Sequence, residues 1–296
     1  MDGIINIFKP KAMTSHDVVS IMRKILNTKK IGHTGTLDPN ATGVLPICIG
    51  KATRIVEYLT DMDKEYISEL TLGVRTDTQD NDGKVVSYSN KTVDEDYIIK
   101  IMTEYVGDIY QMPPMYSALK YKGKKLYELA REGKTVERAP RPITIYNLDI
   151  LNIEDNKKIL FHTKCSRGTY IRTLCDDIGA NLGTYGYMSY LIRTSVGNFK
   201  IEDSYSIDYI KSLTLEEMPK VLTPMDKALN HINEIIVNDE LYFKLINGLM
   251  IHINFKEQYK PNEPLRVYCK GSFIGIGKIL DKDSKLFLKM DKVLII

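Results

Sequence analysis

The feature that most constrains the fold of this chain is the way its strand-like segments are connected. Residues 64–72 alternate between apolar and polar side chains with the period of two that is typical of a β-strand, and Tyr66 falls on the inward face. Similar runs cover residues 3–8, 143–153 and 158–165. Because short turns join such segments as often as helices do, the sequence predicts an α+β fold with a mixed, largely antiparallel central sheet flanked by helices.

Helical segments lie between these strands. Near residue 230 the pattern changes from long helical and strand segments to shorter ones. Ser15 is a candidate N-cap for a first helix, and helical patterns also cover residues 52–59, 95–106, 170–182 and 239–248. Beyond the last of these, glycine-rich turns separate short strands, which indicates a small β-rich module. We therefore expect a main domain over residues 1–232 and a β-rich domain over residues 233–296.

Charge and cysteine usage narrow the class of protein. The formal net charge is only +3, so any affinity for nucleic acid must come from local basic patches. The four cysteines are widely spaced and include no Cys-x-x-Cys pair, which predicts reduced, mostly buried thiols rather than a zinc site or a disulfide scaffold. There is no secretory signal and no apolar run of about 20 residues. We expect a soluble cytoplasmic protein that binds no membrane.

The stretch GHTGTLDPNATGVL, residues 32–45, holds a single carboxylate among residues that favour loops. Pro39 restricts the backbone that aims Asp38, while Gly35 and Gly43 permit unusual backbone angles or the close approach of a ligand. Asp-Pro also commonly opens an ordinary turn, and spacing alone favours that interpretation. Asp38 is therefore a candidate reactive group that needs independent support.

Several familiar sites are missing from the sequence. It contains no phosphate-binding P-loop, no complete dinucleotide-binding glycine motif and no Gly-x-Ser-x-Gly nucleophile motif. Residues 77–85, DTQDNDGKV, resemble a calcium loop, but alignment on Gly83 places Thr78 and Ser89 where carboxylates are required. The five histidines show no spacing typical of metal ligands. Residues 77–85 are better described as a carboxylate-rich turn.

The most basic segment runs from Lys120 to Arg141 and carries eight cations against three anions, a net charge of +5. Tyr116, Tyr121 and Tyr127 are interleaved with these cations. Such a segment is either the solvated face of a helix or a phosphate-contacting surface with aromatic platforms, as RNA binding requires. The candidate RNA contacts within it are Lys120, Lys124, Lys125 and Arg141.

The stretch CSRGTYIRTL, residues 165–174, places Tyr170 and Arg172 at the start of a predicted helix. A buried arginine is costly unless it pairs with an anion. Asp176 or Asp177 on the same helix would be an ordinary partner, and sequence position does not distinguish this pairing from one with a distant carboxylate.

Taken together, these segments resemble the bacterial TruB-type tRNA pseudouridine synthases. The matching motifs follow the family's order and cover essentially residues 4–200: FKPKAMTSHD, GHTGTLDPNATGVLPICIG, KEYISELTLGVRTDTQDNDG, PPMYSALKYKGKKLYELAREG and CSRGTYIRTLCDDIG. The β-rich module is similar, more weakly, to the family's PUA-like domain. Ala12 and Ile192 depart from the family pattern, which usually has glycine and arginine there, and neither touches the reacting groups.

The resemblance implies a pseudouridine synthase fold and the isomerisation of uridine 55 in the T loop of tRNA to pseudouridine, without a metal or organic cofactor. The uridine would be flipped out of its stack. Asp38 would be the nucleophile, Arg172 its partner, and Tyr66 would stack on the uracil and take part in removing the C5 proton. Whether Asp38 attacks the ribose or the base stays open.

The resemblance also implies a set of substrate-binding residues. His33 would help to fill the space that the base vacates, and the other members would line the pocket or brace the loop: Lys9 with Pro10, Asp80, Tyr170 and Leu191. Residues 113–142 would form a thumb over the T stem-loop, and the C-terminal module would touch the acceptor end of tRNA. We expect tRNA as the partner and a monomer without an obligate protein partner.

Two other functions stay open at this point. A non-catalytic protein that binds or folds tRNA would share the architecture but would not need Asp38. A small-molecule enzyme using His33 and Asp38 on a sugar phosphate would lack an affinity for tRNA that falls steeply with salt.

Overall fold

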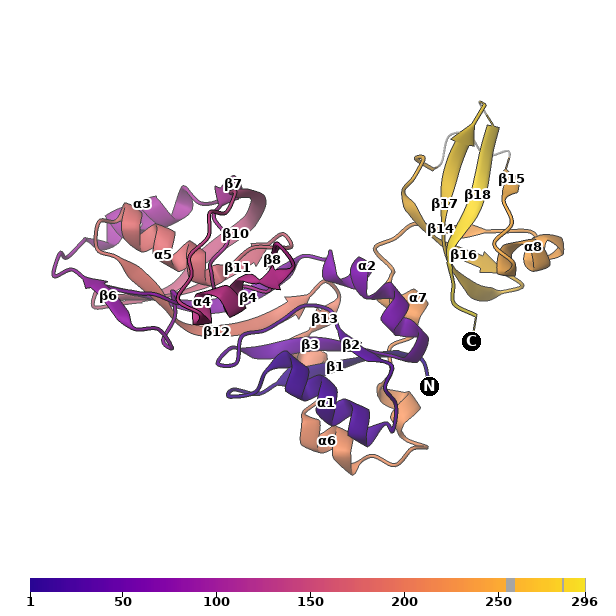
Figure 1. Ribbon diagram of the computed structural model, residues 1–296, viewed down its shortest axis with the longest axis horizontal. Helices are drawn as coiled ribbons and strands as arrows, with labels where there is room; N and C mark the ends of the chain where they lie inside the picture. The colour runs from indigo at the N-terminus through magenta and orange to yellow at the C-terminus, as the bar shows by residue number, and fades with distance from the viewer. Residues whose placement is uncertain (254–258, 284, 296) are drawn as a thin grey trace.

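The structure is a computed structural model that describes residues 1–253, 259–283 and 285–295. Two main sheets dominate these residues. The larger sheet carries most of the helices, and the smaller one stands to one side near the C-terminus (Figure 1). No helix among the described residues combines the length and apolar character needed to cross a lipid bilayer.

The large sheet has nine strands, and its main path in spatial order is β1 (Gly3–Lys9), β3 (Thr42–Ile49), β12 (Gly186–Val196), β4 (Lys64–Leu72), β11 (Lys158–Cys165), β10 (Arg141–Glu154) and β7 (Gly107–Gln111). Two short strands flank this path: β2 (Ile31–His33) pairs with β3, and β13 (Phe199–Lys200) pairs with β12. The paired strands are antiparallel except β3 and β12, which run parallel. The predicted mixed, largely antiparallel sheet is confirmed.

The parallel contact between β3 and β12 is short and divides the large sheet into two halves. It consists of the residue pairs Thr42–Ile192 and Gly43–Arg193. We call this contact the seam. The half-sheet of β1, β2 and β3 lies on one side of it, and the half-sheet of β12, β4, β11, β10 and β7 lies on the other.

Strand β4 shows why the periodic segment at residues 64–72 forms a central strand. Every second residue from Lys64 to Leu72 is buried, and both edges of the strand are hydrogen-bonded, to β11 and to β12. Tyr66 falls on the buried face, as predicted, and is only 8% exposed. The pattern of side chains and the pleat of the strand therefore agree.

Helices cover the two half-sheets separately (Figure 1). α3 (Glu95–Thr103) and α5 (Ile171–Asn181) pack on the half-sheet that contains β4. Around β1 and β3, α1 (Ser15–Ile25) and α6 (Ile207–Ser212) cover one face. The opposite face is covered by η1 (Gly50–Ile55), α2 (Val56–Thr60) and α7 (Met225–Ala228). Because both faces of β1 are buried, its sequence is apolar almost throughout.

The structure corrects several local predictions. The helix predicted at residues 95–106 ends at Thr103, and the one predicted at residues 239–248 is a 3-10 helix over Asp239–Leu241 followed by an α-helix over Tyr242–Ile246. The N-cap of α1 is Thr14 and not Ser15: the Thr14 hydroxyl accepts from the Asp17 amide at 3.0 Å, and the Asp17 carboxylate accepts from the Thr14 amide at 2.9 Å. This reciprocal capping box leaves Ser15 inside the helix, with its hydroxyl free for another partner. The helix predicted at residues 52–59 begins as a 3-10 helix and becomes α-helical only at Val56.

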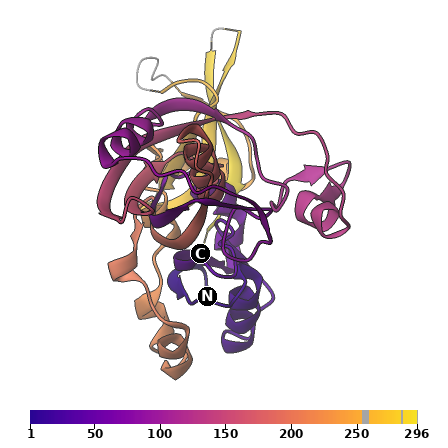
Figure 2. The same cartoon turned by 90° about the vertical axis from the view of Figure 1, so that its left-hand side faces the viewer.

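Residues 112–140, which we call the thumb segment, leave the large sheet between two neighbouring strands. β7 and β10 pair directly, with Gln111 opposite Arg141, so the whole segment is an excursion from one hairpin. It contains β8 (Lys120–Tyr121), β9 (Lys124–Lys125) and α4 (Leu126–Arg131). Figure 2 shows the segment, in magenta, projecting from the side of the body.

The smaller sheet contains β14 (Glu234–Ile236), β16 (Pro264–Cys269), β17 (Ser272–Lys282), β18 (Lys285–Val293) and β15 (Ile251–Ile253), in that order. It packs on the main body through Ile276 and Leu294, which join the apolar cluster around η1 and α7. The Arg54 guanidinium also donates to the Val293 carbonyl at 2.6 Å. The predicted β-rich C-terminal module is therefore present.

The remaining elements are short. β5 (Val74–Thr76) and β6 (Val85–Tyr88) form a hairpin whose turn is the carboxylate-rich segment. The others are η2 (Ile201–Asp203), η3 (Met218–Val221), η4 (Asp239–Leu241) and α8 (Tyr242–Ile246). All four cysteines are buried, free thiols, as predicted.

Candidate active site

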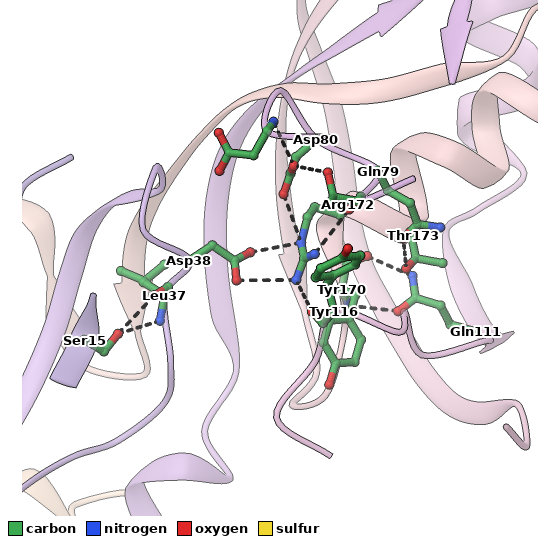
Figure 3. Close-up of polar contacts among 12 residues, drawn as sticks. Ser15, Leu37, Asp38, Gln79, Asp80, Gln111, Tyr116, Tyr170, Arg172 and Thr173 are labelled. Atoms are coloured by element: carbon green, nitrogen blue, oxygen red, sulfur yellow. Dashed lines mark hydrogen bonds and ion pairs between the residues drawn. The ribbon is translucent and has the colours of Figure 1, made fainter. Parts of the chain in front are cut away.

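The two residues with the strongest chemical interest meet across the seam. Asp38 lies in the loop between β2 and β3, and Arg172 lies in the first turn of α5, on the other half-sheet. The Arg172 Nε atom is 2.9 Å from Asp38 Oδ2, and its Nη2 atom donates to Asp38 Oδ1 at 3.4 Å (Figure 3). Two residues 134 positions apart thus form a fork-shaped ion pair.

The remaining donors of Arg172 are used by two other segments. Its Nη2 atom donates to the Tyr116 carbonyl of the thumb segment at 2.8 Å, and its Nη1 atom donates to the Thr78 carbonyl at 3.2 Å. A second carboxylate, Asp80 Oδ2, is 3.7 Å from Nε. The Arg172 side chain is only 6% exposed, whereas that of Asp38 is 37% exposed. The cation is therefore buried and satisfied, and the carboxylate reaches the surface.

The alternative of a pair within α5 is excluded by the same contacts. Asp176 accepts two hydrogen bonds from Arg75, Nε to Oδ1 and Nη2 to Oδ2, both at 2.8 Å. Its negative charge is therefore already paired, and Arg172 pairs with carboxylates from outside its helix.

The loop that carries Asp38 is fixed from three directions. The Ser15 hydroxyl accepts from the Leu37 amide at 2.8 Å and lies 3.2 Å from the Leu37 carbonyl, to which it donates. Lys9 Nζ donates to the Pro39 carbonyl at 3.2 Å. The Ala41 amide donates to the Asp38 carbonyl at 3.1 Å, which closes a turn after the Asp-Pro pair. The Asp-Pro pair therefore does open a turn, as one interpretation of the sequence predicted. The same turn directs the Asp38 carboxylate toward Arg172.

Lys9 braces this loop from inside the protein. It is fully buried, and its Nζ atom also donates to the carbonyls of Pro10 and Met13, at 2.9 and 2.6 Å. Burial lowers the pKa of Lys9 to about 8, and the nearby Asp38 carboxylate opposes this shift. Lys9 thus braces the loop, as the resemblance implied, and its side chain has no exposed surface in this structure. A direct contact of Lys9 with a substrate stays a prediction.

Asp80 lies in the carboxylate-rich turn and faces Arg172. Its Oδ1 atom accepts from the Thr78 hydroxyl at 2.5 Å and from the Asp82 amide at 3.1 Å. Burial raises the pKa of Asp80, although these hydrogen bonds and the Arg172 charge work in the other direction. Asp80 is thus a partner of the buried guanidinium more than an exposed binding group.

The apolar floor next to Asp38 contains the two predicted pocket residues from the sheet. Tyr66 of β4 and Leu191 of β12 are both buried, and they belong to the same cluster as Leu37, the neighbour of Asp38. Burial raises the pKa of Tyr66 to about 12. The phenol is therefore neutral near pH 7 and offers an aromatic surface beside the carboxylate.

Arg193 is a site residue that the sequence analysis missed. It is 2% exposed, its Nε atom donates to the Val44 carbonyl at 2.8 Å, and its Nη2 atom donates to the Gly35 carbonyl at 3.2 Å. Its positive charge also lowers the pKa of Tyr66, against the larger effect of burial. A lone cation within the mostly apolar run of β12 was the available signal, because such a charge must find partners when buried.

Gly35 and Gly43 allow the chain around Asp38 to approach β12 closely at the seam. Gly43 has φ of 108°, and a Cβ added there would lie 2.2 Å from the Arg193 carbonyl oxygen. Gly35 has φ of 153°, and its nearest neighbour is the Arg193 guanidinium. The close approach that these glycines permit is therefore to the chain's own β12.

Two further predicted site residues are His33, at the end of β2, and Tyr170, directly before α5. The His33 Nδ1 atom accepts from the Gly35 amide at 3.3 Å, and burial lowers the pKa of its imidazole, so the ring is neutral. The Tyr170 amide donates to Gln111 Oε1 at 2.8 Å, and Gln111 Nε2 donates back to the Tyr170 carbonyl at 3.0 Å. These bonds tie the end of β7 to the start of α5, next to Tyr116 (Figure 3).

The four predicted RNA contacts lie away from this cluster. Lys120, Lys124 and Lys125 are on the thumb segment, and Arg141 is at the base of that segment in β10. None of them is among the partners of Asp38 or Arg172 within the described residues. The thumb segment reaches the central pair through the Tyr116 carbonyl.

Within residues 1–253, 259–283 and 285–295, no three His, Cys, Asp or Glu side chains gather in an arrangement that would hold a metal ion. The chemistry that this arrangement itself offers is that of one carboxylate, partly exposed, held by a buried guanidinium next to an apolar cluster that contains Tyr66.

Comparisons with known proteins give a consistent result. Two family models match: "TruB family pseudouridylate synthase (N terminal domain)" over residues 23–171 and "tRNA pseudouridylate synthase B C-terminal domain" over residues 172–230. The tRNA pseudouridine synthase B of Alkaliphilus oremlandii is 46% identical over 99% of each chain. That of Clostridium kluyveri is 47% identical over 97% of this chain and 98% of the other.

Among solved structures, a chain of an H/ACA RNP bound to a substrate RNA containing 2'-deoxyuridine superimposes with a TM-score of 0.76 and 28% identity, covering 99% of this chain and 85% of the other. A chain of a Cbf5-Nop10-Gar1 complex superimposes with the same TM-score and 30% identity, over 99% of this chain and 85% of the other.

Proposed function

Since this chain belongs to the TruB family of pseudouridylate synthases, we propose that it isomerises uridine 55 in the T loop of tRNA to pseudouridine. The predicted resemblance, fold class and isomerase activity are confirmed by the family models and by relatives that match nearly the whole chain. The same relatives support tRNA as the class of substrate. Position 55, the flipped base and the aspartate chemistry are our proposal.

The observation that carries this proposal is the asymmetry of the Asp38–Arg172 pair. The cation is buried and the carboxylate is 37% exposed, so an approaching substrate meets the carboxylate first. The buried positive charge favours the charged carboxylate when a nucleotide displaces water from the site. A carboxylate held in a braced loop suits covalent catalysis on a nucleoside, in the manner of carboxylates that attack sugar centres. Over the whole isomerisation the bond between uracil N1 and ribose C1′ breaks and a bond between uracil C5 and C1′ forms. The C5 proton leaves, N1 gains a proton, and the carboxylate is released unchanged.

Base flipping is the step that brings a uridine to this carboxylate. A base inside a folded loop is inaccessible until it leaves the stack, at a cost of a few kcal/mol. The flipped uracil would rest on the Tyr66 ring against Leu191, and His33 would fill the space it leaves.

Tyr66 is the proposed group for removal of the C5 proton. With a pKa near 12 its phenol must first lose its own proton to act as a base, and Arg193 is the neighbour that favours the phenolate. Arg193 therefore acts through Tyr66, as a positioning residue for the proton transfer.

RNA binding is assigned to two surfaces. The thumb segment would close over the T stem-loop through Lys120, Lys124 and Lys125, with Arg141 as a further contact at its base. The C-terminal module, a PUA-like domain in this proposal, would contact the acceptor end. Since these contacts are mainly to phosphates, we expect recognition of the folded shape rather than of base edges. We propose that the protein acts as a monomer without an obligate protein partner, in the cytoplasm.

The direct test is incubation with a T-arm RNA hairpin, followed by mapping of pseudouridine at single-nucleotide resolution. Asp38→Asn should lower the single-turnover rate by at least about a thousandfold, because it removes the nucleophile, while RNA affinity changes little. Asp155→Asn, at the exposed tip of the β10–β11 hairpin, is the control and should react like the unmodified protein.

The outcomes separate the alternatives. Product at another uridine contradicts position 55, and a fully active Asp38→Asn variant contradicts the nucleophile. RNA binding without any product in the unmodified protein would point to a non-catalytic tRNA-binding protein. Binding that does not depend on salt would favour the small-molecule enzyme.

A further inference from the structure

The carboxylate-rich turn contains a residue in an unfavourable backbone conformation next to the active site. Gln79 has φ of 65°, a left-handed conformation that a residue with a Cβ rarely adopts. Such conformations persist only where the surroundings fix them, and they cluster at functional sites. The contacts of Gln79 show what fixes this one.

Both ends of the Gln79 amide are held by α5, the helix that carries Arg172. The Thr173 hydroxyl donates to Gln79 Oε1 at 2.8 Å (Figure 3), and Gln79 Nε2 donates to Asp176 Oδ2 at 2.9 Å. Asp176 is itself fixed by its fork-shaped pair with Arg75, and its side chain is only 5% exposed. The main chain is also anchored, because the Gln79 carbonyl accepts from the Met188 amide at 3.0 Å.

The residues on either side of Gln79 are partners of Arg172. The Thr78 carbonyl accepts from Nη1 at 3.2 Å, and Asp80 Oδ2 lies 3.7 Å from Nε. One side chain between them therefore fixes the orientation of two of the groups that surround the guanidinium. Since Nε also faces Asp38, any rotation of the guanidinium moves the contact with the proposed nucleophile.

We infer that Gln79 is a positioning residue for the proposed isomerisation: clamped between Thr173 and Asp176, it holds the turn that orients Arg172 toward Asp38. This inference rests on the proposed function of that pair. Gln79 touches neither Asp38 nor the open side of the site through any of the contacts described. Gln79 therefore affects the geometry of the reacting carboxylate rather than the affinity for RNA.

The first test replaces the amide without changing the size of the side chain. Gln79→Leu should lower the single-turnover rate at saturating T-arm RNA by about tenfold to a hundredfold, since displacements of about 1 Å at a reacting group have effects of that order. The dissociation constant for RNA should stay within about twofold, because the thumb segment is untouched. Asn156→Leu is the matched control: Asn156 also has a positive φ, 52°, but lies at the tip of the β10–β11 hairpin.

A rescue experiment separates positioning from general destabilisation. In Gln79→Glu a carboxylate oxygen replaces the donor now 2.9 Å from Asp176 Oδ2, so the two acids repel and the rate should fall at least as far as in Gln79→Leu. Adding Asp176→Asn restores a donor to that contact. The double variant should recover at least about fivefold in rate over Gln79→Glu alone, as coupled neighbours do.

Each outcome decides the matter. If the unmodified protein and Asn156→Leu form pseudouridine at position 55 and Gln79→Leu is equally fast, the inference is wrong and the proposed function stands. A loss of RNA affinity that accounts for the whole effect, or no recovery in the double variant, also overturns it. If Gln79→Leu does not fold, Thr173→Val removes one of the two clamps with little change in shape, and an unchanged rate there overturns the inference. If the unmodified protein forms no pseudouridine, the proposed function itself has failed.

Discussion

The active site and the thumb segment are built on opposite principles. Arg172 is buried and takes its partners from three separate parts of the chain, at Asp38, at Thr78 and Asp80, and at Tyr116. The charges of the thumb segment are paired locally: Lys124 and Lys134 both contact Glu132, at 3.3 and 2.7 Å, and all three side chains are more than 40% exposed.

The difference follows from the cost of burying charge. A buried guanidinium must be satisfied by fixed partners, so its surroundings are rigid. Exposed pairs contribute little to stability, and salt or a competing phosphate readily replaces them. The protein thus offers a preorganised carboxylate beside cations that are free to change partners when RNA arrives.

The largest loss of stability and rate should come from replacing the buried cation, Arg172. Arg172→Lys cannot contact both Asp38 oxygens and two carbonyls at once, and it leaves Asp80 poorly compensated. We expect the free energy of unfolding to fall by about 3 to 5 kcal/mol and the single-turnover rate by at least about a hundredfold. Urea denaturation and pseudouridine mapping measure the two effects.

Arg167→Lys is the control for this variant, because Arg167 is 64% exposed and pairs with the exposed Asp61. It should change stability by less than about 0.5 kcal/mol. Equal losses in the two variants would mean that burial does not distinguish the sites.

The thumb segment should respond in binding and not in chemistry. Removing two exposed cations in Lys120→Ala with Lys124→Ala should weaken RNA binding about tenfold near 0.1 M salt and reduce the slope of log Kd against log salt by about 1.5. The rate at saturating RNA should stay within about twofold. Binding titrations at several salt concentrations measure both.

Lys211→Ala with Lys220→Ala removes the same charge from exposed positions in α6 and η3 and should leave binding unchanged. A loss of affinity in that pair as large as in the thumb pair would show that total charge, and not the thumb segment, governs binding.

A smaller effect on the rate is expected from raising the pH, because the buried Lys9 that braces the Asp38 loop loses its proton. Since the pKa of Lys9 is about 8, its Nζ atom loses its proton above that pH and with it one of the donors to the loop carbonyls. If only the charged form holds the loop, the rate at saturating RNA should fall about tenfold between pH 7 and pH 9.

The contribution of Lys9 to stability should rise with pH, whereas the rate falls. Between pH 8 and 10.5 the unfolded lysine keeps a proton that the folded one has lost, so Lys9 makes the free energy of unfolding rise with pH in that window. Lys64 also has a pKa of about 8, lowered by burial, so the loss of rate must persist in Lys64→Met to be assigned to Lys9.

The smallest effect concerns backbone strain at Ala12, beside the Lys9 brace. Ala12 has φ of 62°, which costs a residue with a Cβ about 1 to 2 kcal/mol, so Ala12→Gly should raise the free energy of unfolding by about 0.5 to 1 kcal/mol. Ala180→Gly, at an exposed position within α5, should lower it by a similar amount. If urea denaturation shows that both variants change the free energy of unfolding in the same direction, the backbone strain at Ala12 is contradicted.

Local sequence signals were sufficient for most of the fold. The period of two in β4 predicted both the strand and the burial of Tyr66. The helix predicted at residues 95–106 exists, but it ends at Thr103, three residues earlier than predicted. The N-cap of α1 was misplaced by one residue because serine, taken alone, is a slightly better N-cap residue than threonine. The presence of Asp17 three residues after Thr14 decides between them.

The candidate site divides in the same way. Spacing alone left Asp38 as a candidate in what could be an ordinary Asp-Pro turn, and it left the partner of Arg172 open. The resemblance to the TruB family gave both residues their predicted roles as a pair. Their partnership was not readable from position, since Asp176 stood four residues away from Arg172 and was equally eligible. Gln79 was missed because nothing in its immediate neighbours marks it. Arg193 had one local signal, a cation in the mostly apolar run of β12, which does not by itself indicate a site.

By itself the sequence determined the elements, the alternation of buried faces and the family to which the chain belongs, because these depend on spacing and residue type over short distances. Only the tertiary structure decided that Arg75 takes Asp176, that Arg172 is thereby left for Asp38 and Asp80, and that Lys9 lies inside the protein. The physical reason is that a buried charge selects its partner by where the fold places every competing charge, and that competition is settled in space rather than along the chain.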